Sequence, residues 1–232
     1  LYRSGSLASK PILSSEALSL IDSISPDEEL RKILEHRTQE LIEYQNLSYA
    51  KEYMSFVGNI FEKEQKTRSS SELSQNVAKY LFKLMATKDE YEVARLSLKA
   101  ELDSAINKEF GKSAKISYML HPPFLKAMEN IPILNMLPGV KSKLALGSWF
   151  KVFYVMLKNM KFLRGTPFDF MAWFSNDVRK ADRKALNHYK SILSNNIDEI
   201  GNGKYQDLKE FSILPDIILS LIHISEPTRP NT

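Results

Sequence analysis

Apolar residues recur at intervals of three and four along most of this 232-residue chain, which is the period of an amphipathic α-helix. The clearest stretch begins at Ser25-Pro26-Asp27-Glu28, where a serine cap, a first-turn proline and a glutamate are typical of a helix start. The pattern predicts one long helix from about Asp27 to about Glu64, with a bend at Gly58. Its apolar face would hold Leu30, Ile33, Leu34, Leu41, Tyr44, Leu47 and Ala50.

Four further segments are predicted to be helical. Ser69-Ser70-Ser71-Glu72 and Thr87-Lys88-Asp89-Glu90 each form a capping box, and the second opens a helix that ends near Gly111. The apolar segment Leu144–Leu163 and the periodic segment Asn176–Ile200 complete the set.

The fold class follows from this pattern together with composition. Glycine is scarce, at 8 residues, which disfavours a turn-rich β fold. Lys115–Leu120 alternates apolar and polar residues and predicts one short strand. We therefore expect a mainly α fold, a helical accessory domain with long capped helices and at most a short strand or small sheet.

Three regions are expected along the chain. Residues 1–24 are polar with scattered leucines, which suggests the tail of a preceding catalytic domain or a linker. Residues 25–218 are expected to form the helical domain. Residues 219–232 begin with a run that resembles the conceptual translation of a sequencing-library adapter, and we interpret them as an artefact of sequence assembly.

The amino-acid composition excludes several kinds of site within this chain. There are no cysteines, so disulfides, thiolate zinc sites and protein-ligated iron–sulfur clusters are excluded. The four histidines lie far apart and show no metal-ligand spacing; they are His36, His121, His188 and His223. Glycine-rich phosphate loops and nucleophile elbows are also missing from the sequence. We expect no catalytic, cofactor-binding or metal-binding residue here.

Charge is distributed unevenly along the chain. Val140–Lys190 carries a net charge of +8, whereas Pro26–Glu52 carries −3, although the whole chain is only +4. A helical protein with charge polarised in this way often docks its two ends on each other or on a partner. The basic residues form no dense run, so nucleic acid is not expected. Membrane insertion is not expected either, because lysines interrupt Leu144–Leu163 well short of the roughly 18 apolar residues that a spanning helix needs.

The most concentrated polar cluster is Lys88–Leu96. On a helix, Lys88 would face Glu92 and Glu92 would face Arg95, while Asp89 and Glu90 would lie in the first turn. The simpler interpretation is a capped, salt-bridged helix start. The alternative is a docking surface from which Tyr91 and Arg95 reach a partner.

Two loops also contain candidate residues. His121 precedes Pro122 and Pro123, which would stop a helix or a central strand, and a hydrogen-bonded loop histidine is the expected role. Arg164-Gly165-Thr166-Pro167-Phe168-Asp169 predicts a compact turn. Arg164 and Asp169 could pair across that turn.

Four segments together resemble one known region: Arg37–Ala50, Tyr80–Leu96, Ile116–Pro123 and Lys161–Asp169. In this order and spacing they are similar to the C-terminal region of the fused, single-chain indolepyruvate ferredoxin oxidoreductases. KDEYEVARL and LRGTPFD are the most specific parts of the match. The motif residues, expected to be structural or docking residues, are Lys88, Asp89, Glu90, Tyr91, Glu92, Arg95, His121, Pro122, Pro123, Arg164, Gly165, Thr166 and Asp169.

The resemblance implies part of a cytoplasmic enzyme that oxidatively decarboxylates aryl 2-oxoacids to acyl-CoA and reduces ferredoxin. It further implies thiamine diphosphate, magnesium and a [4Fe-4S] cluster in preceding domains, and a homodimer that uses ferredoxin and CoA. This fragment alone would be inactive. One departure is Phe170–Trp173, which stands where the family usually has Pro-Phe-Gly-Tyr. The alternative is a stand-alone helical interaction module with a basic face.

Overall fold

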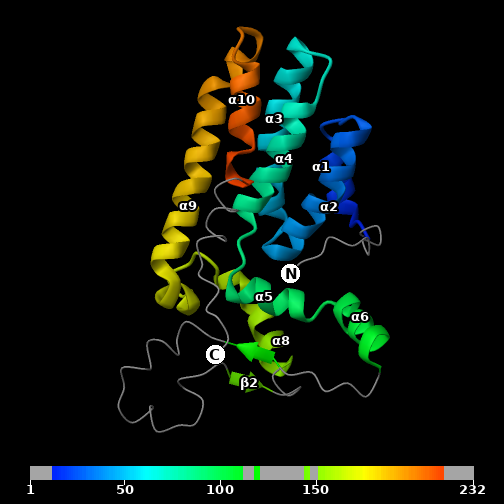
Figure 1. Cartoon of the computed structure of the whole chain (residues 1–232), viewed down its shortest axis with the longest axis vertical. Helices are drawn as coiled ribbons and strands as arrows, with labels where there is room; N and C mark the ends of the chain where they lie inside the picture. The colour runs from blue at the N-terminus through cyan, green and yellow to red at the C-terminus, as the bar shows by residue number, and fades with distance from the viewer. Residues whose placement is uncertain (1–11, 112–117, 121–143, 147–150, 217–232) are drawn as a thin grey trace, which may run out of the picture. The chain divides into compact units, whose positions relative to one another are not determined.

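The computed structural model describes residues 12–111, 118–120, 144–146 and 151–216, and they fold mainly into helices (Figure 1). The mainly α class is confirmed. In this part of the chain the strands are one antiparallel pair, β1 (Tyr118–Leu120) and β2 (Leu144–Leu146), in which Met119 lies opposite Ala145. The α-helices are α1 (Ser15–Asp22), α2 (Glu28–Tyr44), α3 (Leu47–Thr67), α4 (Glu72–Met85), α5 (Glu90–Ser97), α6 (Ala100–Phe110), α8 (Lys151–Asn159), α9 (Phe170–Asn196) and α10 (Tyr205–Ser212).

The chain divides into two compact units. Unit 1 consists of residues 1–86 and 183–232, and unit 2 consists of residues 87–182. The second boundary falls inside α9, so this helix contributes its first part to unit 2 and its second part to unit 1. Two 3₁₀ helices complete the described elements, η3 (Met160–Leu163) in unit 2 and η4 (Ile197–Gly201) in unit 1.

Unit 1 is a helical bundle with a substantial apolar core. α2, α3 and α4 pack against one another, α1 covers α2, and α10 lies along α4 (Figure 1). Tyr53 of α3 is fully buried and donates its hydroxyl to the carbonyl of Ala78 in α4, so even this polar atom is satisfied inside the core. The core also includes Leu30, Leu34, Leu41, Val57, Leu73, Leu81, Leu193 and Ile200.

The predicted single helix from Asp27 to Glu64 is wrong in one respect. It is two helices, because α2 ends at Tyr44 and Asn46 begins α3. The Asn46 side chain accepts a hydrogen bond from the Tyr49 N–H at 2.9 Å, which caps the new helix. Gly58 lies inside α3, where a Cβ atom would stand 2.8 Å from Cγ2 of Ile24. Close packing therefore explains this glycine.

The capping residues also differ from those predicted. Asp27, not Ser25, caps α2 by accepting from the Leu30 N–H at 2.9 Å. Asp89, not Thr87, caps α5 by accepting from the Glu92 N–H at 2.9 Å. Both aspartates lie inside the predicted capping boxes, so the helix starts shift by only two residues.

The later helices differ from the predictions at their ends. The helix expected up to Gly111 is split into α5 and α6, although Gly111 does end α6 with a φ of +82°. Leu144–Leu146 is a strand rather than the start of a helix, and α8 begins at Lys151. α9 begins at Phe170, earlier than Asn176, and gives way to η4 after Asn196.

The described core of unit 2 is small. Tyr91 and Ala94 of α5 pack against Tyr154 and Leu157 of α8, and Leu98, Phe153 and Met160 lie partly buried around them. Four buried apolar side chains supply far less hydrophobic stabilisation than the core of unit 1. Ion pairs between buried charged side chains accompany this small described core.

A buried glutamate joins three helices of unit 1. Glu64 of α3 has no exposed surface. Its carboxylate accepts from the N–H groups of Leu73 and Ser74 at 3.0 and 2.9 Å, and from the Ser74 hydroxyl at 2.5 Å. The Tyr205 hydroxyl of α10 donates to it at 2.7 Å. Ser71, at the predicted capping box, makes no side-chain cap, so Glu64 fills that role for α4.

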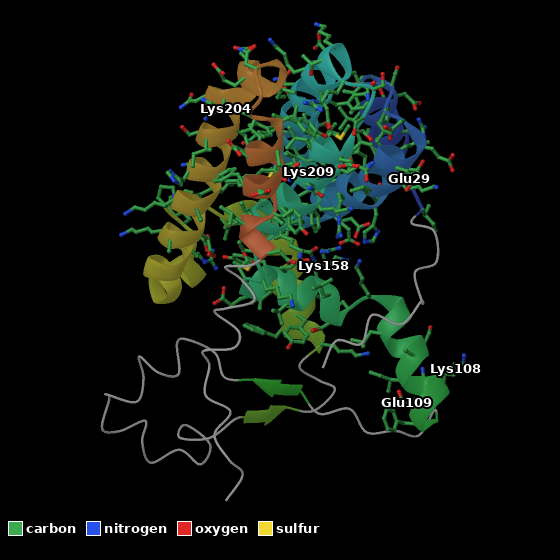
Figure 2. The ribbon with its side chains drawn as sticks, turned by 45° about the horizontal axis from the view of Figure 1, so that its top comes forward. Glu29, Lys108, Glu109, Lys158, Lys204 and Lys209 are labelled. Atoms are coloured by element: carbon green, nitrogen blue, oxygen red, sulfur yellow. The ribbon has the colours of Figure 1, made fainter. Side chains whose placement is uncertain are left out.

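Lysines reinforce this arrangement at the surface of unit 1. Lys209 of α10, labelled in Figure 2, pairs with Glu72 in the first turn of α4. Lys63 of α3 pairs with Asp198 of η4 at 2.5 Å. Exposed pairs of this kind contribute little each, so Glu64 remains the main polar link.

None of the helices within the described ranges is both long enough and apolar enough to cross a bilayer.

We predict that Glu64→Gln lowers the free energy of unfolding by about 2–3 kcal/mol, because an amide NH₂ replaces one acceptor oxygen and faces hydrogen-bond donors. Urea denaturation followed by far-UV circular dichroism measures this. The control is Glu62→Gln, two residues earlier in the same helix, whose side chain is 64% exposed and pairs with Lys66. It should change stability by less than about 0.5 kcal/mol. Equal effects of the two changes would contradict the assigned role of Glu64.

Candidate functional site

The predicted motif residues of α5 and of the turn after η3 meet in one cluster in unit 2. Asp89 caps α5, and its side chain, 6% exposed, receives the guanidinium of Arg164. Nε of Arg164 lies 2.5 Å from Oδ2 of Asp89, and Nη2 lies 2.8 Å from Oδ1. This bidentate pair joins positions 75 residues apart in sequence.

Asp169 closes the turn from the other side. Its side chain is 1% exposed, and its Oδ2 accepts from the Gly165 N–H at 3.0 Å. Gly165 has a φ of +76°, a conformation that glycine adopts without strain. The Thr166 hydroxyl donates to the Leu163 carbonyl at 2.7 Å and fixes the same turn. The compact turn is thus as predicted, but the bidentate pair formed by Arg164 is with Asp89, rather than the predicted pair with Asp169.

Arg179 of α9 completes the cluster, and the sequence prediction missed it. Its Nη1 lies 2.8 Å from Oδ2 of Asp169, and its Nη2 lies 2.7 Å from Oε2 of Glu90. It also approaches Asp89, at 4.0 Å. The one signal in the sequence was its place in the basic segment Val140–Lys190, which does not distinguish Arg179 from the neighbouring lysines and arginine.

Tyr91 lies at the centre of the cluster. It is 1% exposed, and its hydroxyl donates to Oδ1 of Asp169 at 2.9 Å. Burial, together with that hydrogen bond, raises the pKa of the Tyr91 hydroxyl above its ordinary value. The guanidinium carbons of Arg164 and Arg179 lie 5.6 and 5.9 Å from the centre of the ring.

A second ion pair lies within α5. Nε and Nη2 of Arg95 bind the two carboxylate oxygens of Glu92 at 2.9 and 2.8 Å, with both side chains less than a tenth exposed. The predicted pairing of Glu92 with Arg95 is confirmed. Because Arg95 is buried, the alternative in which it reaches out to a partner is not favoured.

Among the described residues, four carboxylates and three arginines form ion pairs around Tyr91; they are Asp89, Glu90, Glu92, Arg95, Arg164, Asp169 and Arg179. Each carboxylate has a guanidinium partner within 3 Å. Because each of these carboxylates is paired with an arginine, the pairs hold distant segments together, and none of these carboxylates is left unpaired for acid–base chemistry.

Metal binding is not indicated by the residues that the structure describes: among them, no three His, Asp or Glu side chains converge as a metal site. His121, Pro122 and Pro123 lie outside the described residues, so their predicted roles stay predictions.

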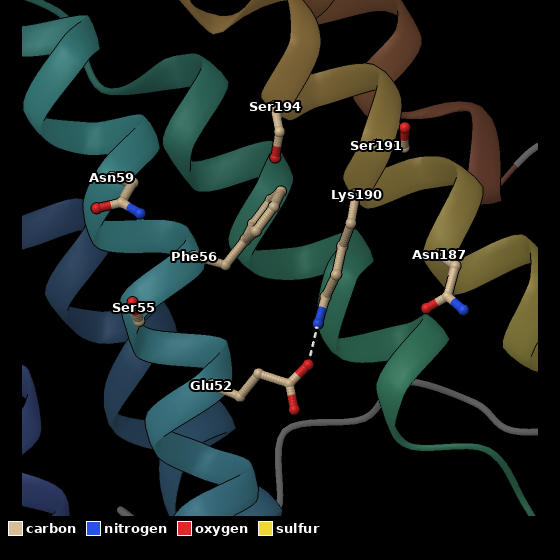
Figure 3. Close-up of a pocket in the computed structure, with 8 residues that line it drawn as sticks. All are labelled: Glu52, Ser55, Phe56, Asn59, Asn187, Lys190, Ser191 and Ser194. Atoms are coloured by element: carbon tan, nitrogen blue, oxygen red, sulfur yellow. Dashed lines mark hydrogen bonds and ion pairs between the residues drawn. The ribbon is translucent and has the colours of Figure 1, made fainter.

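Unit 1 has an open groove of about 580 Å³ between α3 and α9 (Figure 3). Nζ of Lys190 pairs with Glu52 at 2.5 Å across it and lies 5.8 Å from the centre of the Phe56 ring. The remaining lining is short and polar, with Ser55, Asn59, Asn187, Ser191 and Ser194. This lining has no histidine beside a serine, so it offers no activated nucleophile.

Comparison with known proteins gives one match. A family model described as a family of unknown function (DUF6537) matches residues 30–226. No curated protein and no solved structure matches the chain.

We predict that Arg164→Lys lowers the stability of unit 2 by about 1.5–3 kcal/mol, because lysine keeps the charge but cannot form the bidentate pair with Asp89. Both tryptophans, Trp149 and Trp173, fall within the sequence of unit 2, so denaturation followed by their fluorescence reports on it.

The matched control is Arg31→Lys in unit 1. Arg31 also bonds two carboxylates, but its side chain is 36% exposed. This change should cost less than about 1 kcal/mol by circular dichroism. A similar cost at both positions would contradict a special role for the buried pair.

The raised pKa of Tyr91 predicts a pH dependence. The folded state keeps a proton that the unfolded state releases above about pH 10, so this contribution to stability is complete below pH 10 and is lost as the pH rises further. The stability difference between wild type and Tyr91→Phe in unit 2 should therefore shrink above pH 10. Tryptophan-detected denaturation at pH 8 and pH 11 measures it. The control is Tyr80→Phe, at a half-buried position in unit 1, followed by circular dichroism at the same two pH values. A difference independent of pH would contradict the prediction.

Proposed function

The chain belongs to DUF6537, a family of unknown function, and we propose that it is the non-catalytic C-terminal helical region of an indolepyruvate or related 2-oxoacid:ferredoxin oxidoreductase. The proposal takes its enzyme class from the resemblance of four segments, Arg37–Ala50, Tyr80–Leu96, Ile116–Pro123 and Lys161–Asp169. The full enzyme would decarboxylate aryl 2-oxoacids oxidatively to acyl-CoA and reduce ferredoxin.

The observation that supports a non-catalytic role is the way in which the motif residues are used. The two most specific segments, around Asp89 and around Asp169, bind each other through Arg164, Tyr91 and Arg179. A catalytic motif has to leave reactive groups accessible to a substrate. Here the motif carboxylates are paired with arginines, which is typical of residues that hold segments of a fold together.

The cofactors belong to the rest of the proposed enzyme. A [4Fe-4S] cluster needs thiolates, and this chain has no cysteine. Thiamine diphosphate, magnesium and the cluster would therefore be held by preceding catalytic domains, and this region would support those domains. The same proposal includes a cytoplasmic homodimer that takes ferredoxin and CoA.

A stand-alone interaction module with a basic face is the second candidate. It is favoured by exposed lysines such as Lys158 in α8 and Lys184 in α9. The reading frame upstream of Leu1 in the genome distinguishes the two. Thiamine-diphosphate and γ-type domains directly before it support the oxidoreductase, whereas a start codon without such domains supports the module.

We predict that the purified chain turns over no indolepyruvate with thiamine diphosphate, Mg²⁺, CoA and ferredoxin, measured as ferredoxin reduction. In the longer gene product, Arg164→Lys should lower the yield or lifetime of assembled enzyme without changing KM for the oxoacid. The matched control in that enzyme is Arg31→Lys. Turnover by the short chain, or a changed KM in fully assembled enzyme, would contradict the non-catalytic role.

A further inference from the structure

Exposed large apolar side chains are concentrated in the described part of unit 2. Among the described residues, eleven large hydrophobic side chains are exposed, and eight of them belong to unit 2, although unit 2 contributes fewer described residues than unit 1. Scattered exposed apolar residues are normal in proteins, but a contiguous group marks an interaction site.

The exposed group is contiguous on α8. Val152, Val155 and Met156 are 75%, 47% and 46% exposed, and their spacing of three and four places them on one face of the helix. Phe162 of η3, 68% exposed, follows shortly after them in the chain. The inward face of α8 is already used, since Tyr154 and Leu157 pack on α5. α8 is therefore apolar on two sides, and among the described residues the core cluster of unit 2 covers one of them.

The segment that carries this face is basic in sequence. Residues 151–168 contain Lys151, Lys158, Lys161 and Arg164 and no acidic residue. Arg164 is engaged with Asp89 in the buried cluster. Lys158, labelled in Figure 2, is exposed at the end of α8. An apolar strip beside lysines is complementary to an apolar strip beside carboxylates.

We propose that the outer face of α8, made of Val152, Val155 and Met156 beside Lys158, docks an amphipathic helix with acidic flanks from a partner polypeptide. Helix recognition uses apolar anchors at this spacing and flanking charges to set orientation. The inference does not rest on the proposed function, because the partner helix can come from the same longer chain or from another protein.

Charge and length argue against two other occupants. A second copy that docked the same face would bring lysines against lysines, which is unfavourable. A lipid surface suits an amphipathic helix with a broad charged face opposite its apolar one, whereas the opposite side of this nine-residue helix is packed on α5.

The test uses an 18-residue helical peptide with leucines on one face and glutamates beside them, labelled for fluorescence anisotropy. Its counterpart carries lysines in place of the glutamates. The wild-type chain should bind the glutamate peptide at least tenfold more tightly than the lysine peptide. The double variant Val152→Ser with Met156→Ser should lose at least tenfold in affinity for it.

Two further variants separate the face from general effects. Leu18→Ser, at an exposed apolar residue of α1 in unit 1, should leave binding unchanged. Lys158→Glu should lower the affinity for the glutamate peptide and raise the affinity for the lysine peptide, each by at least threefold. Circular dichroism and thermal unfolding confirm that each variant folds like the wild type.

Several results would overturn the proposal. They are no binding, equal binding of both peptides, or binding that the double variant leaves intact. Binding to vesicles of phosphatidylserine and phosphatidylcholine that the double variant abolishes would assign the face to lipid. A concentration-dependent dimer in analytical ultracentrifugation, lost in that variant, would assign it to a second copy.

Discussion

A carboxylate removed from water must find hydrogen-bond donors within the protein, and both units are organised around that requirement. In unit 1 the fully buried Glu64 receives two backbone N–H groups and two hydroxyls, and so ties α4 and α10 to α3. In unit 2 the carboxylates of Asp89 and Asp169 receive arginines and a tyrosine. The carboxylate of Glu64 lies at the N-terminus of α4 and that of Asp89 at the N-terminus of α5, where the helix dipole favours an anion.

The two units differ in what else supports them. Unit 1 has a large apolar core, to which Glu64 adds specificity of packing. The described part of unit 2 buries four apolar residues in its core cluster, and arginine–carboxylate pairs join its segments beside that cluster. Such pairs contribute modest net stability after desolvation, but breaking one leaves a buried charge unpaired. Buried pairs of this kind fix which segments meet in unit 2.

The contacts of the buried carboxylates also bear on the proposed function. A charged motif at the start of a helix is compatible with either chemistry or structure, and the contacts of Asp89, Glu90 and Asp169 favour structure because each faces an arginine. The surface of α8 differs from the buried cluster in this respect. Apolar side chains on α8 face solvent next to lysine, and interactions with other molecules are expected there rather than at the buried cluster.

Local sequence was sufficient for the mainly helical fold, the short strand at Tyr118–Leu120, the helix end at Gly111 and the pairing of Glu92 with Arg95. These depend on periodicity, on backbone conformation and on residues within one turn of each other. Local sequence did not reveal the break at Asn46, because the apolar pattern of a helix continues on both sides of this capping residue. It also could not reveal Glu64 as the cap of α4, the pair of Arg164 with Asp89, or the role of Arg179. Those partners lie up to 89 positions apart in the chain, and only tertiary packing decides which opposite charge meets each buried carboxylate.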